Sequence, residues 1–466
     1  MTEKLGKQDD IAAALPFAGG RVGDQHTAVA GTIDSGGTAA APQSAGPISE
    51  SRPANAGAAR AADPFFSGRK HYPALDGLRA LAIIGVIGLH FGGAISHSQA
   101  VAGGPLALAL FKLFHHGAWG VDLFFVLSGY LITGILLQSR GQEHYFRNFY
   151  ARRTLRIFPL YYGVLLAVLV GVPLALGHVP EMLAAAYRHQ AWLWTYTSNF
   201  EVARKGLVLG DFGHFWTLAI EEQFYLVWPL VIMLVPVKRM FAAIASLVVV
   251  INIGRILFFA LSAHAASAPV YEYVYNLTPF RADTLLAGAA LAVWQSRGSL
   301  PQFRRAFILC FWATLPAVLL CYLGASRGWP DVPALLMVHV TASPLLIGSF
   351  MGIMLTSGPE GMLNRLFSVH ALRAIGKYSY AMYVFHLIYL PIQVRYLPFS
   401  LFAGLLHSAL LGLPAYYASA VGVAFCLALC SYHLYEKHFL KLKKYFPERV
   451  AGPIASPVPG VNGSRQ

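Results

Sequence analysis

The feature that most constrains this chain is a series of long apolar runs, each close to the ~20 residues that a helix needs to cross a bilayer. Such runs fold as helices, because backbone polar groups in lipid must be satisfied within the segment. The predicted spans are 80–97, 118–138, 157–177, 215–235, 241–262, 282–296, 306–324, 335–356, 378–397 and 412–433. We therefore predict an all-α, polytopic membrane protein with about ten transmembrane helices that enclose a polar cavity.

The composition excludes a soluble domain. Of the 466 residues, 56% are hydrophobic and 12% are charged, whereas about 25% are charged in an average globular protein. The formal charge of +14 does not indicate a nucleic-acid partner, because the basic residues fall in short loops between apolar runs. By the positive-inside rule these loops mark the cytoplasmic side, and an even number of spans places both termini there.

The chain divides into three predicted regions. Residues 1–68 are rich in Ala, Gly, Ser and Pro, which is typical of disorder, so we predict a disordered cytoplasmic extension. Residues 69–440 are predicted to form the transmembrane domain, and residues 441–466 a short cytoplasmic tail. The stretch 185–200 is too short and polar to span and is expected at the membrane interface. The cysteines lie in apolar runs, where a thiol packs as a small hydrophobe, and no metal site is expected.

Several charged or titratable residues lie inside predicted spans, where such groups usually line a cavity or a pathway. His90 follows Arg79 at a spacing of about 16 Å along a helix, so the two share one face. The order of the spans also places several polar residues in the same outer half of the membrane: His90, Asp122, Glu221 or Glu222, and Asp283. We predict that they surround one polar cavity.

A histidine beside carboxylates suits the transfer of an acyl group to an alcohol. Neutral imidazole takes the proton of a hydroxyl, while a carboxylate holds its tautomer and stabilises the imidazolium. We therefore expect His90 to be the general base, with Glu221 or Asp122 orienting it. Ser128 is expected to be a small residue for close helix packing and not a nucleophile. The alternative for His90 is a hydrogen bond to a neighbouring helix and no catalysis.

A basic cluster lies in the loop 140–156, where five arginines accompany Glu143. Arg153 and Arg156 are three residues apart and therefore share a helix face. Guanidinium groups hold phosphate oxygens in bidentate pairs, so we expect these two and Arg152 to bind a coenzyme with several phosphates. The alternative interpretation is a topogenic signal or a contact with anionic lipid head groups.

Two further predictions concern helix ends and helix faces. Tyr383 and His386 lie on neighbouring turns of the span 378–397 and are candidates to line the acyl passage. This spacing of aromatic and histidine side chains along one helix is also typical of packing between helices.

Asp76 is expected to cap the first helix, because an Asp side chain there accepts backbone N–H bonds.

Six motifs, in this order, give the chain a resemblance to a known family. They are YPALDGLRALAIIGVIGLHF, GVDLFFVLSGYLI, FYARRTLRIFPLYY, FGHFWTLAIEEQFYLVWPLV, FRADTLLAGAALA and IGKYSYAMYVFH. Over residues 70–440 the sequence resembles the membrane acyltransferase 3 family, which modifies cell-surface and secreted carbohydrates in bacteria.

The resemblance implies a bacterial inner-membrane enzyme that moves an acyl group, most simply acetyl, from cytoplasmic acyl-CoA to a hydroxyl of a surface or exported carbohydrate. Acetyl-CoA is then the expected co-substrate, and the partners are a carbohydrate acceptor and the lipid bilayer, without metal or nucleic acid. The resemblance implies functional roles for these residues: Arg79, His90, Arg153, Arg156, Glu221, Arg281 and Asp283. Thr217 stands where the family commonly has serine, and it keeps the hydroxyl.

Two other classes of protein stay open at this point. Charge within the membrane also marks transport paths, so the main alternative is a transporter or flippase for a glycan or a lipid-linked intermediate. The other is a membrane anchor that recruits partners through residues 1–68.

Overall fold

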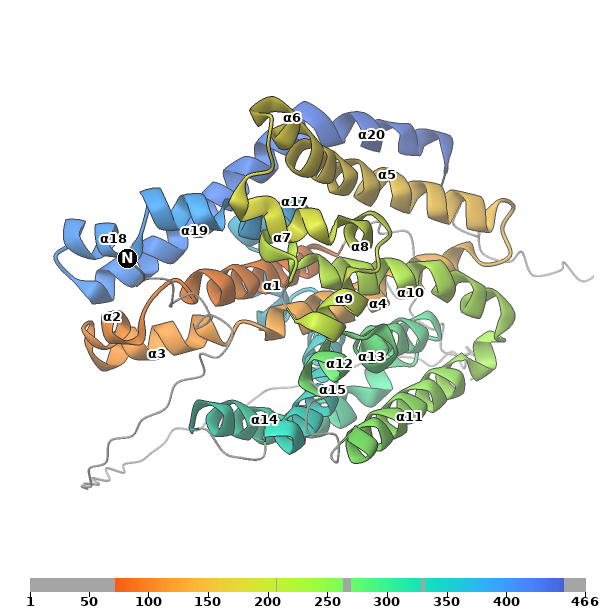
Figure 1. Cartoon of the computed structure of the whole chain (residues 1–466). Helices are drawn as coiled ribbons and strands as arrows, with labels where there is room; N and C mark the ends of the chain where they lie inside the picture. Colours follow the sequence, from red (N-terminus) through yellow and green to blue (C-terminus); the bar gives the residue numbers. More distant parts are fainter. Residues whose placement is uncertain (1–71, 207, 263–269, 328–331, 448–466) are drawn as a thin grey trace, which may run out of the picture.

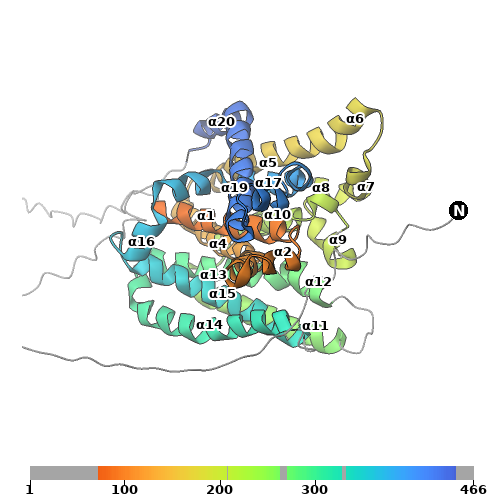
Figure 2. The same ribbon diagram turned by 90° about the vertical axis from the view of Figure 1, so that its left-hand side faces the viewer.

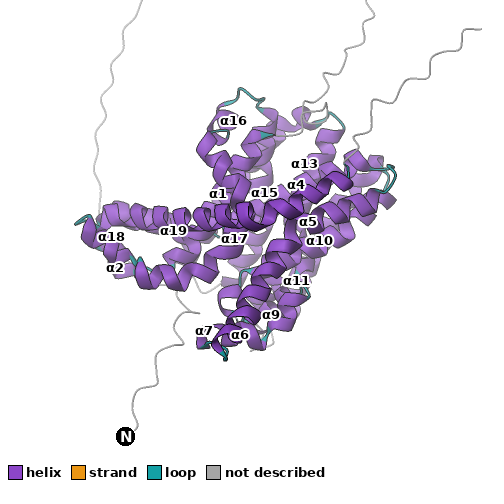
Figure 3. Ribbon diagram, turned by 90° about the horizontal axis from the view of Figure 1, so that it is seen from above, coloured by secondary structure: helices purple, strands orange, loops and turns teal. Residues whose placement is uncertain are grey.

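The computed structural model describes residues 72–206, 208–262, 270–327 and 332–447. The predicted disordered extension at residues 1–68 lies outside the described residues, and so does the predicted tail 441–466 from residue 448 onward. Within the described ranges all regular secondary structure is helical, as Figure 3 shows. The predicted all-α fold is confirmed.

Ten long helices, of 19 to 27 residues, form the body of the described chain. They are α1 (Pro73–Gly92), α4 (Trp119–Ser139), α5 (Tyr145–Leu165), α10 (Phe215–Leu234), α11 (Val237–Ser262), α13 (Thr278–Ser296), α14 (Arg304–Arg327), α15 (Val332–Thr356), α17 (His370–Tyr396) and α19 (Ala409–Ser431). Eight of them lie in segments long and apolar enough to cross a membrane. The other two, α13 and α17, are more polar and correspond to predicted spans 282–296 and 378–397. The predicted multi-pass membrane architecture is confirmed.

Short helices connect the long ones. They are α2 (His97–Val101), α3 (Gly104–His115), α6 (Val172–Leu176), α7 (Glu181–Arg188), α8 (Gln190–Trp194), α9 (Ser198–Lys205), α12 (Val270–Asn276), α16 (Met362–Phe367), α18 (Phe399–Leu405) and α20 (Lys437–Lys441). Two π-helical segments, Leu166–Gly171 and Tyr432–Glu436, continue α5 and α19. The stretch 185–200 is divided among α7, α8 and α9, each of which is too short to span.

The molecule has two ends, which Figure 1 places at opposite sides of the view. The α4–α5 turn, the α10–α11 turn and α20 lie at one end, and α2, α3 and α18 lie at the other. Arg140 joins the two turns, because its guanidinium donates to the carbonyls of Val235 at 2.9 Å and Met233 at 3.1 Å. Asn148 joins the C-terminal segment to α5 by donating to the carbonyl of Pro447 at 3.2 Å. We call the end formed by residues 139–153, 234–239 and 437–447 the basic end.

The centre of the molecule depends on very close helix contacts. Figure 2 shows α1, α4 and α13 between α14 on one side and α19 and α20 on the other. A Cβ added to Gly129 of α4 would lie 1.8 Å from the carbonyl oxygen of Leu285, and one added to Gly288 of α13 would lie 1.9 Å from that of Val126. Small residues permit this approach, which supplies the packing that holds helices together in lipid.

The first helix, α1, begins at Pro73, seven residues before the predicted span 80–97. Pro73 lies in its first turn, a position that proline favours because its fixed φ suits a helix start and its missing N–H is not needed there. Tyr72 is the N-cap residue and makes no side-chain capping bond. Asp76 instead accepts a hydrogen bond from Nη1 of Arg79 at 2.6 Å. The prediction that Asp76 caps the helix is therefore wrong.

We expect the substitution Gly288→Val to destabilise the fold, since the new side chain would overlap the backbone of α4 and not a flexible side chain. Overpacking typically costs about 1–3 kcal/mol, and a clash with backbone lies at the upper end. Thermal unfolding of the protein in detergent measures the loss. Gly422→Val on α19 is the matched control, because nothing lies within 4 Å of its added Cβ. Equal stability of the two variants would contradict the close α4–α13 contact.

Candidate active site

A cavity of about 310 Å³ lies between α1, α4, α5, α10 and α17. Its wall reaches the surface at the basic end. The residues of the mouth are Gln142, Glu143, Asn148, Lys443 and Pro447. The opposite part of the wall contains Thr217, Glu221, Glu222 and Tyr383. The predicted polar cavity is therefore present, and it connects the basic end with the interior.

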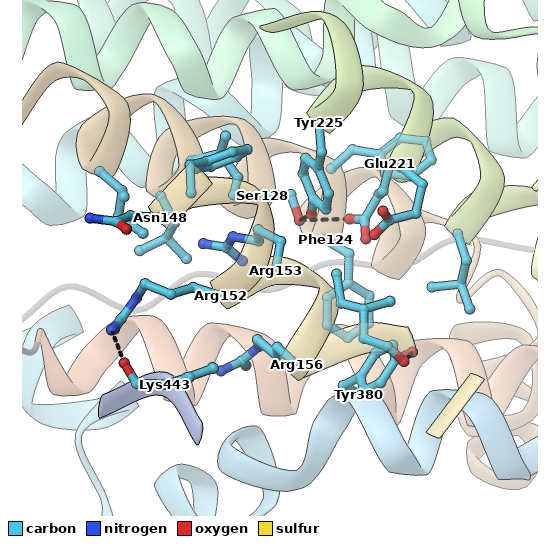
Figure 4. A pocket seen from close by; sticks show the side chains of 18 of the residues that line it. Phe124, Ser128, Asn148, Arg152, Arg153, Arg156, Glu221, Tyr225, Tyr380 and Lys443 are labelled. Carbon is cyan, nitrogen blue, oxygen red and sulfur yellow. Dashed lines mark hydrogen bonds between the residues drawn. The ribbon is translucent and has the colours of Figure 1, made fainter. Parts of the chain in front are cut away.

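Four arginines, together with Lys443 at the mouth, form the cationic part of this wall. Arg79 comes from α1, whereas Arg152, Arg153 and Arg156 come from the first turns of α5, as Figure 4 shows for the last three. Arg152 donates to the carbonyl of Phe446 at 3.0 Å, which holds the C-terminal segment at the mouth. Guanidinium groups gathered on one wall favour an anion with several oxygens, such as a phosphate-bearing ligand.

The guanidinium of Arg153 lies between aromatic rings. Its Cζ is 5.9 Å from the ring centre of Phe149 and 5.7 Å from that of Tyr225. Stacking on aromatic faces orients the planar fork without using its donors. The arrangement therefore holds Arg153 toward the cavity.

A hydrogen-bonded triad of Ser128, Glu221 and Tyr225 lies beside the arginines (Figure 4). The Ser128 hydroxyl donates to Oε1 of Glu221 at 2.6 Å, and the Tyr225 hydroxyl donates to Oγ of Ser128 at 3.1 Å. Ser128 was expected to serve close packing, but the adjacent Gly129 makes the close contact with α13. Glu222 also lines the cavity, and its buried Oε1 has no hydrogen-bond partner among the described residues.

Tyr383 separates the cavity from a group of histidines. Its hydroxyl donates to the carbonyl of His214 at 3.0 Å and lies 2.6 Å from Oγ1 of Thr217. Both Tyr383 and Thr217 line the cavity. The hydroxyl of Tyr383 is hydrogen-bonded, and its backbone carbonyl lies 2.6 Å from Nδ1 of His386. Tyr383 therefore forms a fixed part of the wall.

Behind this wall, His90 of α1 and His386 of α17 are in contact, and His214 packs against His386 with ring centres 4.6 Å apart. Nδ1 of His386 lies 2.6 Å from the carbonyl of Tyr383, and Nδ1 of His90 lies 2.9 Å from the carbonyl of Val86. His386 Nε2 lies 3.1 Å from His90 Nδ1.

These contacts assign the tautomers of two rings. A carbonyl oxygen only accepts hydrogen bonds, so Nδ1 carries the proton in neutral His386 and in neutral His90. His386 Nε2 is then an acceptor for His90 Nδ1–H. By this network, Nε2 of His90 is left unprotonated, as a general base requires. His90 as a residue is half-buried and its ring is not part of the cavity wall, and the partner that orients the ring is His386, not Glu221 or Asp122 as predicted.

The remaining candidates form two buried ion pairs. Arg281 donates to Asp122, and Arg255 donates to Asp283. All four side chains are almost completely buried, and the cavity wall formed by the described residues does not include them. The prediction that His90, Asp122 and Asp283 surround one cavity together with Glu221 is wrong: the two aspartates are neutralised by arginines from other helices, and His90 lies behind the wall. A charge left alone in the bilayer would cost several kcal/mol.

Sequence reasoning missed Arg255 and the partner of Ser128. Arg255 lies in the middle of the apolar span 241–262, and the rule that intramembrane charge is paired would have singled it out. No sequence pattern pairs Ser128 with Glu221, since they lie on different helices 93 positions apart. The described residues contain no group of three or more ligands arranged to hold a metal ion.

Comparison with known proteins defines the class. A family model described as an acyltransferase domain, Acyl_transf_3, matches residues 72–433. Peptidoglycan O-acetyltransferase OatA of Listeria monocytogenes is 31% identical over 328 residues, which cover 68% of this chain and 49% of the relative. The putative peptidoglycan O-acetyltransferase YrhL of Bacillus subtilis is 29% identical over 68% of this chain and 48% of its own length. O-acetyltransferase OatA of Staphylococcus aureus is 28% identical, with coverage of 68% and 50%.

The matched region thus spans about half the length of these curated relatives. No solved structure matches the chain significantly. The helical fold and the matched region define a multi-pass membrane protein with a domain of the acyltransferase 3 class. The chain belongs to the acyltransferase 3 family, and this assignment favours an enzyme over the transporter and anchor alternatives.

We expect Asp122→Asn to lower stability by about 3–5 kcal/mol, because it leaves the buried charge of Arg281 without a counter-charge. Thermal unfolding in detergent is the measurement. The double substitution Asp122→Leu with Arg281→Met removes both charges and should recover most of the loss. A fully stable but inactive Asp122→Asn protein would instead favour a chemical role for this carboxylate.

Proposed function

We propose that this protein transfers an acetyl group from acetyl-CoA to a hydroxyl of a carbohydrate at a bacterial inner membrane. The observation that carries the proposal is the cavity, which combines a cationic mouth with a hydrogen-bonded carboxylate in its interior. Three relatives with O-acetyltransferase names support the acetyl group, and two of those names specify peptidoglycan as the acceptor. A cell-wall glycan is accordingly the first acceptor to test.

The basic end would face the cytoplasm by the positive-inside rule, which puts the mouth on the side where acetyl-CoA is made. The donor's phosphates would bind Arg152, Arg153 and Arg156. Its uncharged arm would follow the apolar residues that α4 contributes to the wall, Leu131, Ile132 and Ile135. The thioester would then lie near Ser128 and Glu221. With eight or ten crossings, both termini would be cytoplasmic.

His90 would act as general base toward the acceptor hydroxyl through its unprotonated Nε2. His386 would stabilise the resulting imidazolium by accepting the hydrogen bond from Nδ1 of His90. Arg79, which lines the cavity on the same helix, would balance negative charge on the donor or on the developing oxyanion.

The direct test uses purified protein in lipid nanodiscs with acetyl-CoA and soluble peptidoglycan fragments. We expect release of the free thiol of coenzyme A together with a base-labile acetyl ester on the glycan. Folded protein that produces neither with peptidoglycan nor with other exported glycans would refute the proposed activity.

We expect His90→Gln to lower kcat by about 10²- to 10⁴-fold, the usual contribution of a general base, while the protein remains folded. The rate of acetyl ester formation is the measurement. His370→Gln is a suitable control, since His370 is exposed at the first residue of α17, far from the histidine group. A His90→Gln protein with the wild-type rate would rule out the base assignment.

We expect Arg153→Ala with Arg156→Ala to raise KM for acetyl-CoA by about tenfold or more, because a hydrogen bond to a charged group contributes about 1.5–3 kcal/mol. Initial rates at varied acetyl-CoA concentration measure the change. Arg147→Ala is the matched control, since Arg147 lies on the same helix, is exposed and is not part of the cavity wall. Unchanged donor dependence in the double variant would assign the cluster to topology alone.

A further inference from the structure

We propose that Ser128 is a covalent acyl carrier, acetylated by the donor in the cavity before the acetyl group passes to the acceptor. This inference rests on the proposed function, because it requires a thioester donor. It goes beyond that function by adding an acyl-enzyme intermediate. The observation behind it is the hydroxyl of Ser128, which faces a carboxylate inside the cavity that holds the arginines.

The hydrogen bonds around Ser128 are those of an activated nucleophile. Its hydroxyl donates to Oε1 of Glu221 at 2.6 Å, so the carboxylate is placed to take the proton as Oγ attacks. The Tyr225 hydroxyl donates to the same Oγ at 3.1 Å. Oγ therefore keeps a donor partner after its own proton has left.

Ser139 provides a comparison on the same helix. It also borders the cavity, three turns nearer to the mouth. Its hydroxyl donates to the carbonyl of Ile135, in the preceding turn of its own helix, at 2.9 Å. A backbone carbonyl accepts a hydrogen bond but does not act as a base. Of these two serines, only Ser128 has a base in contact.

The first half-reaction balances within the cavity. Ser128 Oγ forms a bond to the carbonyl carbon of the thioester, and the bond from that carbon to sulfur breaks. The proton of Oγ passes to Glu221 and from there to the thiolate, so the products are acetyl-Ser128 and free coenzyme A. Arg153 supplies positive charge close to this centre, because it stacks on the ring of Tyr225.

The second half-reaction uses the acceptor. In this route Glu221, which the first half-reaction leaves ionised beside Ser128, takes the proton of the acceptor hydroxyl in place of His90, and the acceptor oxygen bonds to the carbonyl carbon of acetyl-Ser128. The bond from that carbon to Oγ breaks, and the Ser128 alkoxide regains the proton that the acceptor gave up. The net reaction is transfer of one acetyl group, without oxidant, reductant or metal in the balance.

The test is incubation of the wild-type protein in nanodiscs with acetyl-CoA alone, followed by acid quench, proteolysis and mass spectrometry. We expect one acetyl group on the peptide that contains Ser128, and its loss when peptidoglycan fragments are added before the quench. Ser128→Ala should remove both the label and the turnover, and Ser296→Ala, on α13 and outside the cavity wall, should keep both. Glu221→Gln should slow labelling.

The outcomes distinguish this inference from the function on which it depends. If the wild type makes acetylated glycan but carries no acetyl group on Ser128, or if Ser128→Ala keeps the wild-type rate, the carrier role is refuted and the proposed function stands. If the wild type makes no acetylated product from any exported glycan, the proposed function itself fails. A label on Ser128 that does not move to the acceptor would also refute the carrier role.

Discussion

A charge inside hydrocarbon must be neutralised by the protein itself, and this constraint organises the centre of the molecule. Arg281 of α13 reaches Asp122 of α4, while Asp283 of the same helix turns to Arg255 of α11. The first pair joins α13 to α4, and the second joins α13 to α11. The pairs fix α4, α11 and α13 relative to one another, and glycines bring α4 and α13 into backbone contact.

With these helices fixed, the opposite face of α4 forms a wall of the cavity. Ser128 is on this face, and the neighbouring Gly129 is held against α13, so the tight packing and the hydroxyl belong to adjacent residues. The cavity wall combines arginines from α1 and α5 with carboxylates from α10. A cationic mouth and an interior that contains carboxylates are therefore built from helices that are far apart in the sequence.

The helical architecture could be predicted from the sequence, because the length of an apolar run and the charge of a loop are each properties of one short segment. The same was true of Arg153 and Arg156, whose three-residue spacing on one helix predicted a shared face that the cavity uses. Contacts between helices were not predictable in this way. Asp122 and Asp283 have the polar character of cavity residues in the sequence, yet both are neutralised by partners that only the packing reveals. His386 was recognised as a candidate, but its role beside His90 depends on the approach of α1 and α17.

The contact between His90 and His386 also limits where a captured proton can go. When a proton enters at Nε2 of His90, the proton on Nδ1 of that ring can be shared with Nε2 of His386, but Nδ1 of His386 points at the carbonyl of Tyr383. A carbonyl oxygen is too weak a base to carry the proton onward. These contacts therefore keep the proton within the two rings and offer it no onward acceptor at Tyr383.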